Sequence, residues 1–165
     1  MPFYAGSFLV ARPTLQDPSF RQTVVLLLEH NAEGAFGLVV NRPRPVEGIP
    51  FPVYYGGPCQ SDGLLMLHAH PEWLPQGESE KRQVAPGIYM GDASCLERVS
   101  GSDSSELRFR MFAGYAGWGP GQLERELALG AWVIVPAHAE RLFGLAADEM
   151  WELLVPWRFP QPSVN

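Results

Sequence analysis

The chain has 165 residues, 46% of them hydrophobic, and its 12 basic and 18 acidic residues give a net charge of −6. This length suits a single domain with a core of its own. No run of about 18 apolar residues occurs, so no transmembrane helix is expected. The acidic balance argues against direct nucleic-acid binding, which needs Lys and Arg to neutralise phosphates.

The start of the chain and its cysteines indicate a compartment. The first residues lack a basic segment before an apolar one, so we expect no signal peptide and predict a cytoplasmic protein. Only two cysteines occur, Cys59 and Cys95. Two cysteines make no disulfide framework and fit a reducing compartment.

The first third of the chain is predicted to form strands joined by turns. Ser7–Arg12 is the first expected strand. The continuous apolar run Thr23–Glu29 predicts a strand that is covered on both faces. Asn31–Gly34 predicts a turn, and Phe36–Asn41 completes a β-hairpin.

The register of this hairpin bears on where its polar residues can act. With a four-residue turn, His30 pairs with Ala35 near the turn, and Asn41 pairs with Val24 at the far end. The sequences Glu-His-Asn and Asn-Arg-Pro around these positions then lie roughly 20 Å apart, at about 3.3 Å per residue. We therefore expect them to belong to different sites.

The middle of the chain is predicted to add strands and shorter segments. Val53–Gly57 and Leu64–His70 read as strands, and Gly87–Asp92 as a short one. The polar stretch Glu72–Gln83 is expected to be a mobile loop. Ala93–Val99 is expected to be a short helix.

Alternation predicts a half-buried strand after a flexible connection at 100–106. Within Leu107–Phe112, the apolar residues fall on one face, and Arg108 and Arg110 fall on the other. A helix of about ten residues and a strand at Ala131–Val135 follow, which suggests a crossover between parallel strands.

The last third of the chain completes the predicted fold class. Ala137–Phe143 and Ala147–Val155 read as helices, and residues 156–165 read as an irregular or disordered tail. We therefore predict one compact α+β domain over residues 1–155. It would hold a mixed, largely antiparallel sheet with hairpins, one βαβ-like crossover and C-terminal helices.

Four motifs occur in an order that resembles a known family. They are "GSFLVARPTLQDPSFRQTVVLLLEHNAEGAFGLVVNRP", "YYGGP", "LHAHP" and "GYAGWGPGQLERELALGAW". Together they resemble the AlgH/YqgE family of bacterial proteins, over about Gly6 to Trp151. The resemblance implies a cytoplasmic α+β domain and a role in regulating transcription, linked to alginate synthesis in some bacteria. It carries over no catalytic residue, ligand or cofactor.

The glycine-rich stretch "AGYAGWGPGQLERE" at 113–126 has a structural and a functional interpretation. A helix that starts at Pro120, with Gly119 as its cap and Trp118 packed on Leu123, accounts for most of it. A phosphate site at the helix N-terminus is the alternative. Pro120 lacks an N–H, glutamates follow, and the spacing matches no phosphate-loop motif, so the structural turn is favoured.

Other residues could line a ligand or partner surface. Arg42 has a planar fork that suits an anion or an internal carboxylate, and the Gly-Gly-Pro turn lets a ligand or another backbone approach closely. The candidate ligand- or partner-binding residues are therefore Asn41, Arg42, Gly56, Gly57, Gly117, Trp118, Gly119 and Gln122. We predict no cofactor and no metal, because His68 and His70 form an H-x-H pair without an identifiable third ligand.

Three functions remain open at this point. The first is a regulatory protein that acts through a small molecule or a protein partner rather than by binding DNA directly, as a monomer or weak homo-oligomer. The second is an enzyme that uses Glu29, His30 or Arg42 beside a pocket near the glycine-rich stretch. The third is a homo-oligomeric structural protein with an apolar interface.

Overall fold

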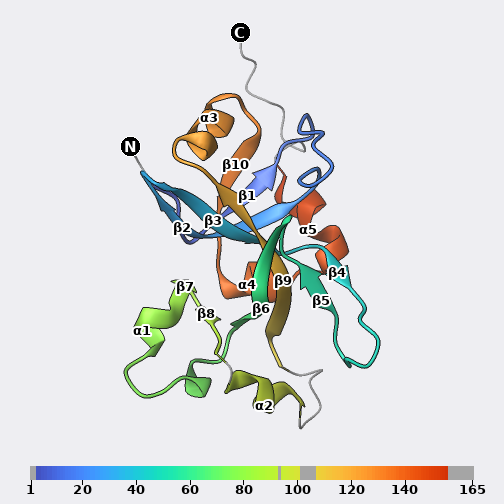
Figure 1. Cartoon of the computed structure of the whole chain (residues 1–165), viewed down its shortest axis with the longest axis vertical. Helices are drawn as coiled ribbons and strands as arrows, with labels where there is room; N and C mark the ends of the chain where they lie inside the picture. The colour runs from blue at the N-terminus through green and yellow to red at the C-terminus, as the bar shows by residue number, and fades with distance from the viewer. Residues whose placement is uncertain (1–2, 93, 101–106, 156–165) are drawn as a thin grey trace.

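The computed structural model describes residues 3–92, 94–100 and 107–155. The first six elements along the chain are strands, and short helices are interspersed with the remaining strands (Figure 1). The strands are β1 (Ser7–Ala11), β2 (Val24–Asn31), β3 (Gly34–Val39), β4 (Pro43–Arg44), β5 (Val53–Tyr55), β6 (Cys59–His68), β7 (Gln83–Ala85), β8 (Ile88–Met90), β9 (Phe109–Trp118) and β10 (Trp132–Pro136). The helices are η1 (Pro71–Trp73, 3₁₀), α1 (Ser79–Arg82), α2 (Cys95–Ser100), α3 (Gln122–Ala128), α4 (Ala139–Phe143) and α5 (Ala147–Leu154). Among the described residues, none of these helices has the length and apolar character needed to span a membrane.

The strands form one curled, mostly antiparallel sheet, which confirms the predicted α+β fold. Its main path runs β10-β1-β2-β3-β9-β6-β8-β7, and β4 and β5 lie off this path. Strand β9 is central because it pairs with β3, β6 and, in parallel, with β5. Strands β9 and β10 are joined through α3 and run in the same direction, since four antiparallel steps separate them. They are not neighbours, so this crossover spans three strands.

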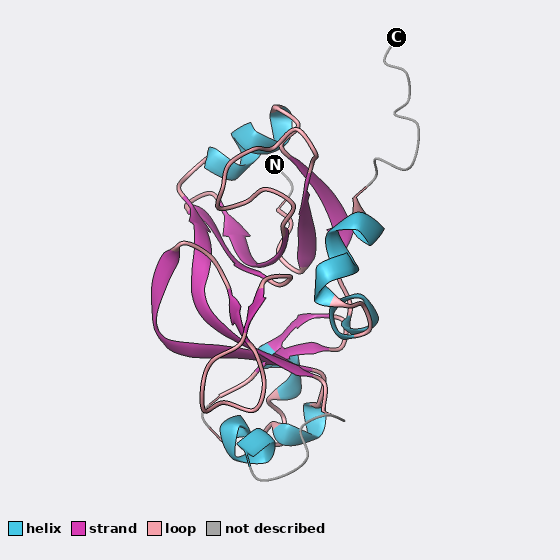
Figure 2. Cartoon of the chain, turned by 90° about the vertical axis from the view of Figure 1, so that its right-hand side faces the viewer, coloured by secondary structure: helices cyan, strands magenta, loops and turns pink. Residues whose placement is uncertain are grey.

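The apolar run of β2 is covered on both faces, as predicted. Val24 and Leu26 point into a core that also holds residues of α4 and α5. Val25 and Leu27 point into a second core, which Leu123 of α3 closes. Figure 2 shows the helices around the outside of the strands. A strand between two cores needs apolar residues at every position, which explains the lack of alternation.

The β2–β3 hairpin has the predicted register at its turn but not at its far end. His30 lies opposite Ala35, as expected. A β-bulge between Leu27 and Glu29 then adds one residue to β2. The amide of Val40, instead of Asn41, therefore pairs with the Val24 carbonyl at 2.9 Å. A bulge shifts every later pair by one residue, and the local pattern of apolar residues does not indicate where it occurs.

Four local predictions need correction or lie outside the described residues. The stretch Glu72–Gln83 is not a continuous loop, because η1 ends within it and α1 occupies four of its residues. The linker before Leu64 belongs to β6, which begins at Cys59. Residues 101–106 and the predicted tail at 156–165 lie outside the described residues.

Arg110 is buried, although alternation placed it on an outer face. Its side chain is 7% exposed. Nη1 donates to the Val40 carbonyl at 2.6 Å, and Nη2 donates to the Leu145 carbonyl at 3.4 Å. The guanidinium also lies 4.8 Å from the centre of the Tyr54 ring, and burial lowers its pKa. The face is covered by other segments, and the arginine supplies N–H donors to carbonyls there.

The glycine-rich stretch begins as a strand, and its helix starts later than predicted. Strand β9 continues to Trp118, and α3 begins at Gln122 rather than at Pro120. Gly121, with φ of 74°, precedes the helix in the cap position expected for Gly119. The Gln122 side chain accepts a hydrogen bond from the Gly119 amide at 3.0 Å. Trp118 and Leu123 pack in the same core, as predicted.

Candidate functional site

Two glycine motifs meet where the chain leaves β5 and passes β9. A Cβ on Gly56 would lie 2.3 Å from the Gly114 carbonyl oxygen, and a Cβ on Gly57 would lie 2.3 Å from the backbone of Tyr115. The Gly56 amide donates to the Ala113 carbonyl at 2.9 Å. The two backbones therefore touch without side chains between them, which only glycine permits. We call this contact the glycine crossing.

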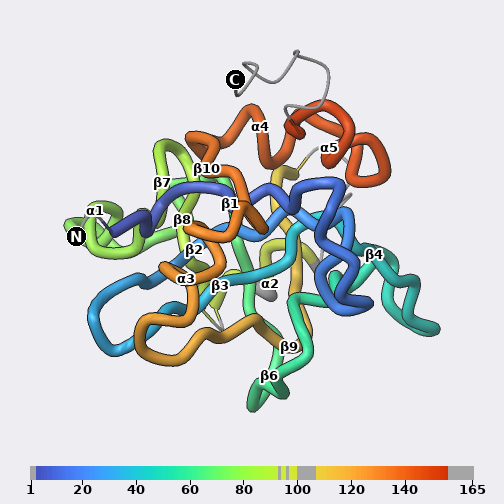
Figure 3. Tube along the Cα trace, turned by 90° about the horizontal axis from the view of Figure 1, so that it is seen from above, coloured from blue at the N-terminus to red at the C-terminus, as the bar shows by residue number. Residues whose placement is uncertain are grey.

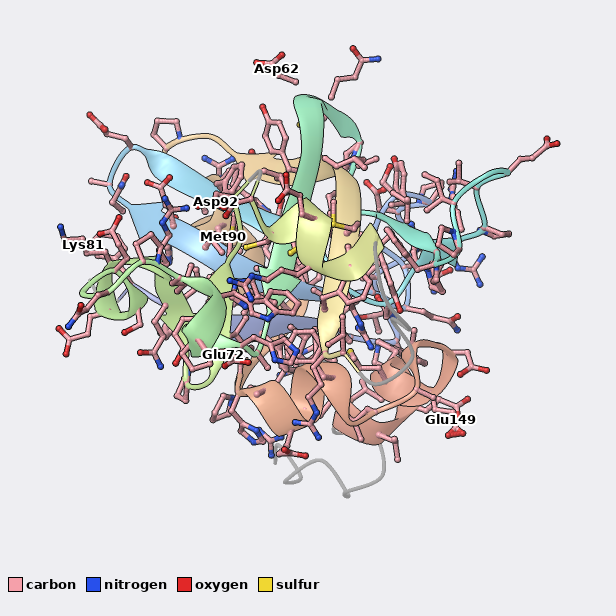
Figure 4. All side chains as sticks on the ribbon, turned by 90° about the horizontal axis from the view of Figure 1, so that it is seen from below. Asp62, Glu72, Lys81, Met90, Asp92 and Glu149 are labelled. Carbon is pink, nitrogen blue, oxygen red and sulfur yellow. The ribbon has the colours of Figure 1, made fainter. Side chains whose placement is uncertain are left out.

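A hollow of about 430 Å³ opens beside the glycine crossing. This hollow, which we call the glycine hollow, is lined by Tyr55, Gly57, Pro58, Cys59, Gln60, Ser61, Ala113 and Gly114. The Ser61 hydroxyl accepts a hydrogen bond from the Gly114 amide at 3.0 Å, which holds Ser61 of β6 against Gly114 of β9. The outer part of β6 bulges away from β9, and Asp62 projects from its tip (Figure 4). None of the lining side chains is charged.

Asn41 and Arg42 hold the segment at residues 18–23 in place. Asn41 accepts from the Val24 amide at 3.0 Å and donates to the Gln22 carbonyl at 3.0 Å. Arg42 donates to the carbonyls of Ser19 and Arg21, at 2.8 and 2.9 Å. The expected carboxylate partner of Arg42 is thus replaced by two backbone oxygens. Burial lowers the pKa of Arg42, and the charges of Arg44 and Arg21 lower it further.

A second hollow of about 340 Å³ lies between this segment and α5. Figures 1 and 3 both show the blue segment after β1 beside α5. This second hollow, which we call the charged hollow, is lined by Pro18, Arg21, Gln22, Asn41, Arg42, Ala147, Asp148, Trp151 and Glu152. The predicted candidates Asn41 and Arg42 therefore line a hollow that contains none of the candidate glycines.

The candidates of the 117–122 stretch lie elsewhere. Trp118 is 6% exposed, and its indole N–H donates to Glu126 at 2.9 Å. Its edge borders a third, smaller hollow of about 210 Å³ at the turn of the β2–β3 hairpin. A Cβ on Gly117 would lie 3.9 Å from the Cys59 sulfur, so this residue is near the glycine hollow. The candidate residues thus divide among three places and form no single site.

Comparison with known proteins identifies the family. The AlgH-like family model matches residues 8–156.

The chain belongs to the AlgH-like family.

Several relatives and two solved structures agree with this assignment. A UPF0301 protein of Thioalkalivibrio sulfidiphilus is 32% identical over 90% of this chain and 86% of its own. A UPF0301 protein from Streptomyces coelicolor is 38% identical over 88% of this chain and 82% of its own. The solution structure of AlgH from Pseudomonas aeruginosa has a TM-score of 0.66 at 32% identity, covering 90% of this chain and 85% of that one. The crystal structure of protein DIP2367 from Corynebacterium diphtheriae has a TM-score of 0.74 at 26% identity, covering 98% and 90%.

His30, the candidate acid or base of this AlgH-like chain, has structural partners on both ring nitrogens. Nδ1 accepts from the Tyr4 amide at 3.0 Å, so the proton of the neutral ring lies on Nε2. That nitrogen lies 3.2 Å from a carboxylate oxygen of Glu124 in α3. The His30 side chain is buried. The residue therefore ties the N-terminal segment and α3 to the hairpin, and no free nitrogen is left for proton transfer.

A cysteine and a histidine that sequence reasoning kept apart meet where β6 ends and α2 begins. Nδ1 of the buried His68 accepts from the His70 amide at 3.1 Å, which places the proton on Nε2. Nε2 faces the sulfur of Cys95 at 3.9 Å, and the thiol faces Asp92 at 3.7 Å. Because His68 donates toward the sulfur, it cannot accept the thiol proton as a base. Cys95 and His68 are both fully buried, so the cluster is structural.

Burial and the neighbouring His70 lower the pKa of His68 to about 4. The rings of His68 and His70 stack with centroids 6.3 Å apart. His70 in turn contacts Glu72 at 3.1 Å and accepts from the Arg108 amide at 3.0 Å. Figure 4 labels Glu72 and Asp92 on this side of the molecule. Across residues 3–92, 94–100 and 107–155, no three His, Cys, Asp or Glu side chains are arranged to hold a metal.

Proposed function

We propose that the protein is a cytoplasmic regulator of transcription that acts by binding a protein partner rather than DNA. The glycine hollow is the observation that carries this proposal. Its walls offer backbone groups, an amide, a hydroxyl, a thiol and the Tyr55 ring, and none of its side chains is charged. An uncharged peptide segment matches such walls, because its amides can exchange hydrogen bonds with them without desolvating a charge.

The surroundings of the glycine hollow support the same partner. Leu64 lies on β6 just beyond the hollow and is 47% exposed, so an apolar contact is available at its edge. The protein's net charge of −6 opposes a nucleic-acid partner. Several cationic side chains have internal partners. Arg108 pairs with Glu140 at 2.7 Å, and Arg110 is buried.

The proposal is tested by placing one charge in the glycine hollow. Gln60 is exposed on its wall, and Gln60→Glu adds a carboxylate with little change in size. The matched control is Gln83→Glu, an exposed position on β7. In a strain that lacks the gene, we expect the Gln83→Glu protein to restore the normal transcript profile. The Gln60→Glu protein should be as stable in thermal unfolding, but the transcript profile should remain that of the deletion strain.

A direct measurement separates the partner from DNA. Fluorescence anisotropy with labelled duplex DNA at about 0.1 M salt should show no salt-sensitive binding, since phosphate contacts weaken steeply with salt. Salt-sensitive duplex binding would contradict the proposal. So would normal transcript levels with the Gln60→Glu protein.

A further inference from the structure

The charged hollow carries opposite charges on facing walls. Arg21 comes from the segment after β1 and Arg42 from the connection between β3 and β4, whereas Asp148 and Glu152 come from α5. Asp148 and Glu152 are four residues apart, so they lie on the same face of the helix. This hollow shares no lining residue with the glycine hollow, so a ligand bound here is independent of the proposed function.

The positive wall is held in position by the main chain. Two N–H groups of Arg42 donate to the carbonyls of Ser19 and Arg21, which fixes the plane of its guanidinium. A guanidinium has five N–H donors, so further donors of Arg42 are left. Arg21 is exposed beside it. Two neighbouring guanidinium groups repel each other, and an anion between them relieves that repulsion.

The two walls do not neutralise each other. Among the described residues, the ion pairs within 4.0 Å involve other partners. These are His30–Glu124, His70–Glu72, Lys81–Glu78, Arg82–Asp92 and Arg108–Glu140. Arg21 and Arg42 thus line the same space as Asp148 and Glu152 without touching them. Opposite charges that face one another across a hollow are matched by a molecule that carries both signs.

The rest of the lining of the charged hollow has an apolar part beside the polar residues Gln22 and Asn41. Trp151 is 8% exposed, and its indole N–H donates to the Ala11 carbonyl at 2.7 Å, which fixes the ring. Pro18 and Ala147 complete this part. We infer that the charged hollow binds a free α-amino acid with an apolar side chain. Its carboxylate lies at Arg21 and Arg42, its ammonium at Asp148 and Glu152, and its side chain against Trp151.

The three parts of this ligand can be tested with matched molecules. L-phenylalanine has all three, 3-phenylpropionate lacks the ammonium group, and 2-phenylethylamine lacks the carboxylate. Isothermal titration calorimetry of the full chain should show binding of L-phenylalanine or L-leucine at millimolar concentration or below. Each of the two incomplete molecules should bind at least tenfold more weakly, since each leaves one charged wall unpaired.

Variants of the two walls locate the binding. Arg21→Ala and Asp148→Ala should each weaken amino-acid binding about tenfold or more. Arg125→Ala and Glu47→Ala change charges outside the charged hollow and should leave binding unchanged. Arg42 is less suitable for such a variant, because it also holds the 18–23 segment.

Three results would overturn the inference. The first is no binding of either apolar amino acid at roughly 10 mM, a concentration that would reveal even a weak complex. The second is equal binding of 3-phenylpropionate and L-phenylalanine. The third is unchanged amino-acid binding in both wall variants. A transcript profile that responds to Gln60→Glu is independent of all three. Failure here therefore leaves the proposal for the glycine hollow in place.

Discussion

The glycine hollow and the charged hollow are built in opposite ways. The first takes its shape from two backbones in contact, Gly56–Gly57 against Gly114–Tyr115. The second takes its character from the charged side chains of Arg21, Arg42, Asp148 and Glu152, of which Arg42 bonds to main-chain carbonyls. Changes at the glycine crossing should therefore affect folding, whereas removing the charge of Arg21, Asp148 or Glu152 should affect binding with little effect on stability.

The largest expected effect follows from Gly57→Ala. Gly57 has φ of 150°, and a Cβ there would lie 2.3 Å from the carbonyl carbon and oxygen of Tyr115. Neither backbone can move without breaking the pairing of β5 and β6 with β9. We expect a loss of more than about 3 kcal/mol in the free energy of unfolding, measured by urea denaturation.

Gly63→Ala is the matched control for this substitution. A Cβ on Gly63 meets nothing within 4 Å, and the residue lies on the outer part of β6. We expect its free energy of unfolding to stay within about 0.5 kcal/mol of the wild type. Equal losses in the two variants would show that the glycine crossing does not set the fold of this region.

The glycine crossing also shows where sequence reasoning stops. The family, the fold class and most strands followed from motifs and apolar periodicity, because these are local signals. The glycines of 114–121 looked like a loop before a helix, yet Gly114 and Gly117 belong to β9. The reason is a partner backbone at Gly56–Gly57, far away in sequence. No spacing within the stretch encodes that partner.

Polar side chains were harder to place than strands. Alternation gave the correct parity for Arg110 but could not show that its face is covered and offers the Val40 carbonyl. The pairing of Cys95 with His68 joins β6 to α2 and depends on tertiary packing alone. Asn41 and Arg42 were selected from the sequence as binding candidates, but their bonds to residues 18–23 could be seen only in the folded chain.

The second expected effect is a pH dependence that comes from buried His68, away from both hollows. A histidine in the unfolded chain takes up a proton near pH 6.5, whereas folded His68 does so near pH 4. Between these values the unfolded state binds more protons, so stability is complete above pH 6.5 and falls as the pH drops toward 4. The shift corresponds to about 3 kcal/mol.

Urea denaturation at pH 7, 5.5 and 4 measures this dependence. His68→Asn keeps an acceptor for the His70 amide but has no group that titrates, so its stability should change much less over this range. His138→Asn is the control, since asparagine is also a good helix cap and should replace the cap that His138 provides to α4. If His68→Asn kept the full dependence, groups other than His68 would have to be its source.

A smaller loss is expected for Asn41→Ala, which tests the structural side of the charged hollow. The substitution leaves the Val24 amide and the Gln22 carbonyl without their side-chain partner. We expect a loss of about 2 kcal/mol in thermal or urea unfolding. Gln16→Ala is the comparison, because it removes only an exposed bond to the Pro13 carbonyl and should cost less than about 0.5 kcal/mol. Similar losses for the two variants would mean that Asn41 does not hold the 18–23 segment.

The smallest effect on stability is expected for Arg21→Ala, and here a small effect is informative. The Arg21 side chain is exposed, and within the described residues it has no carboxylate within 4.0 Å. Its removal should change the free energy of unfolding by less than about 0.5 kcal/mol, measured by urea denaturation without added ligand. A loss as large as that of Asn41→Ala would show that the arginine wall holds the fold together. The contrast between a hollow built by backbone and one built by free charges would then fail.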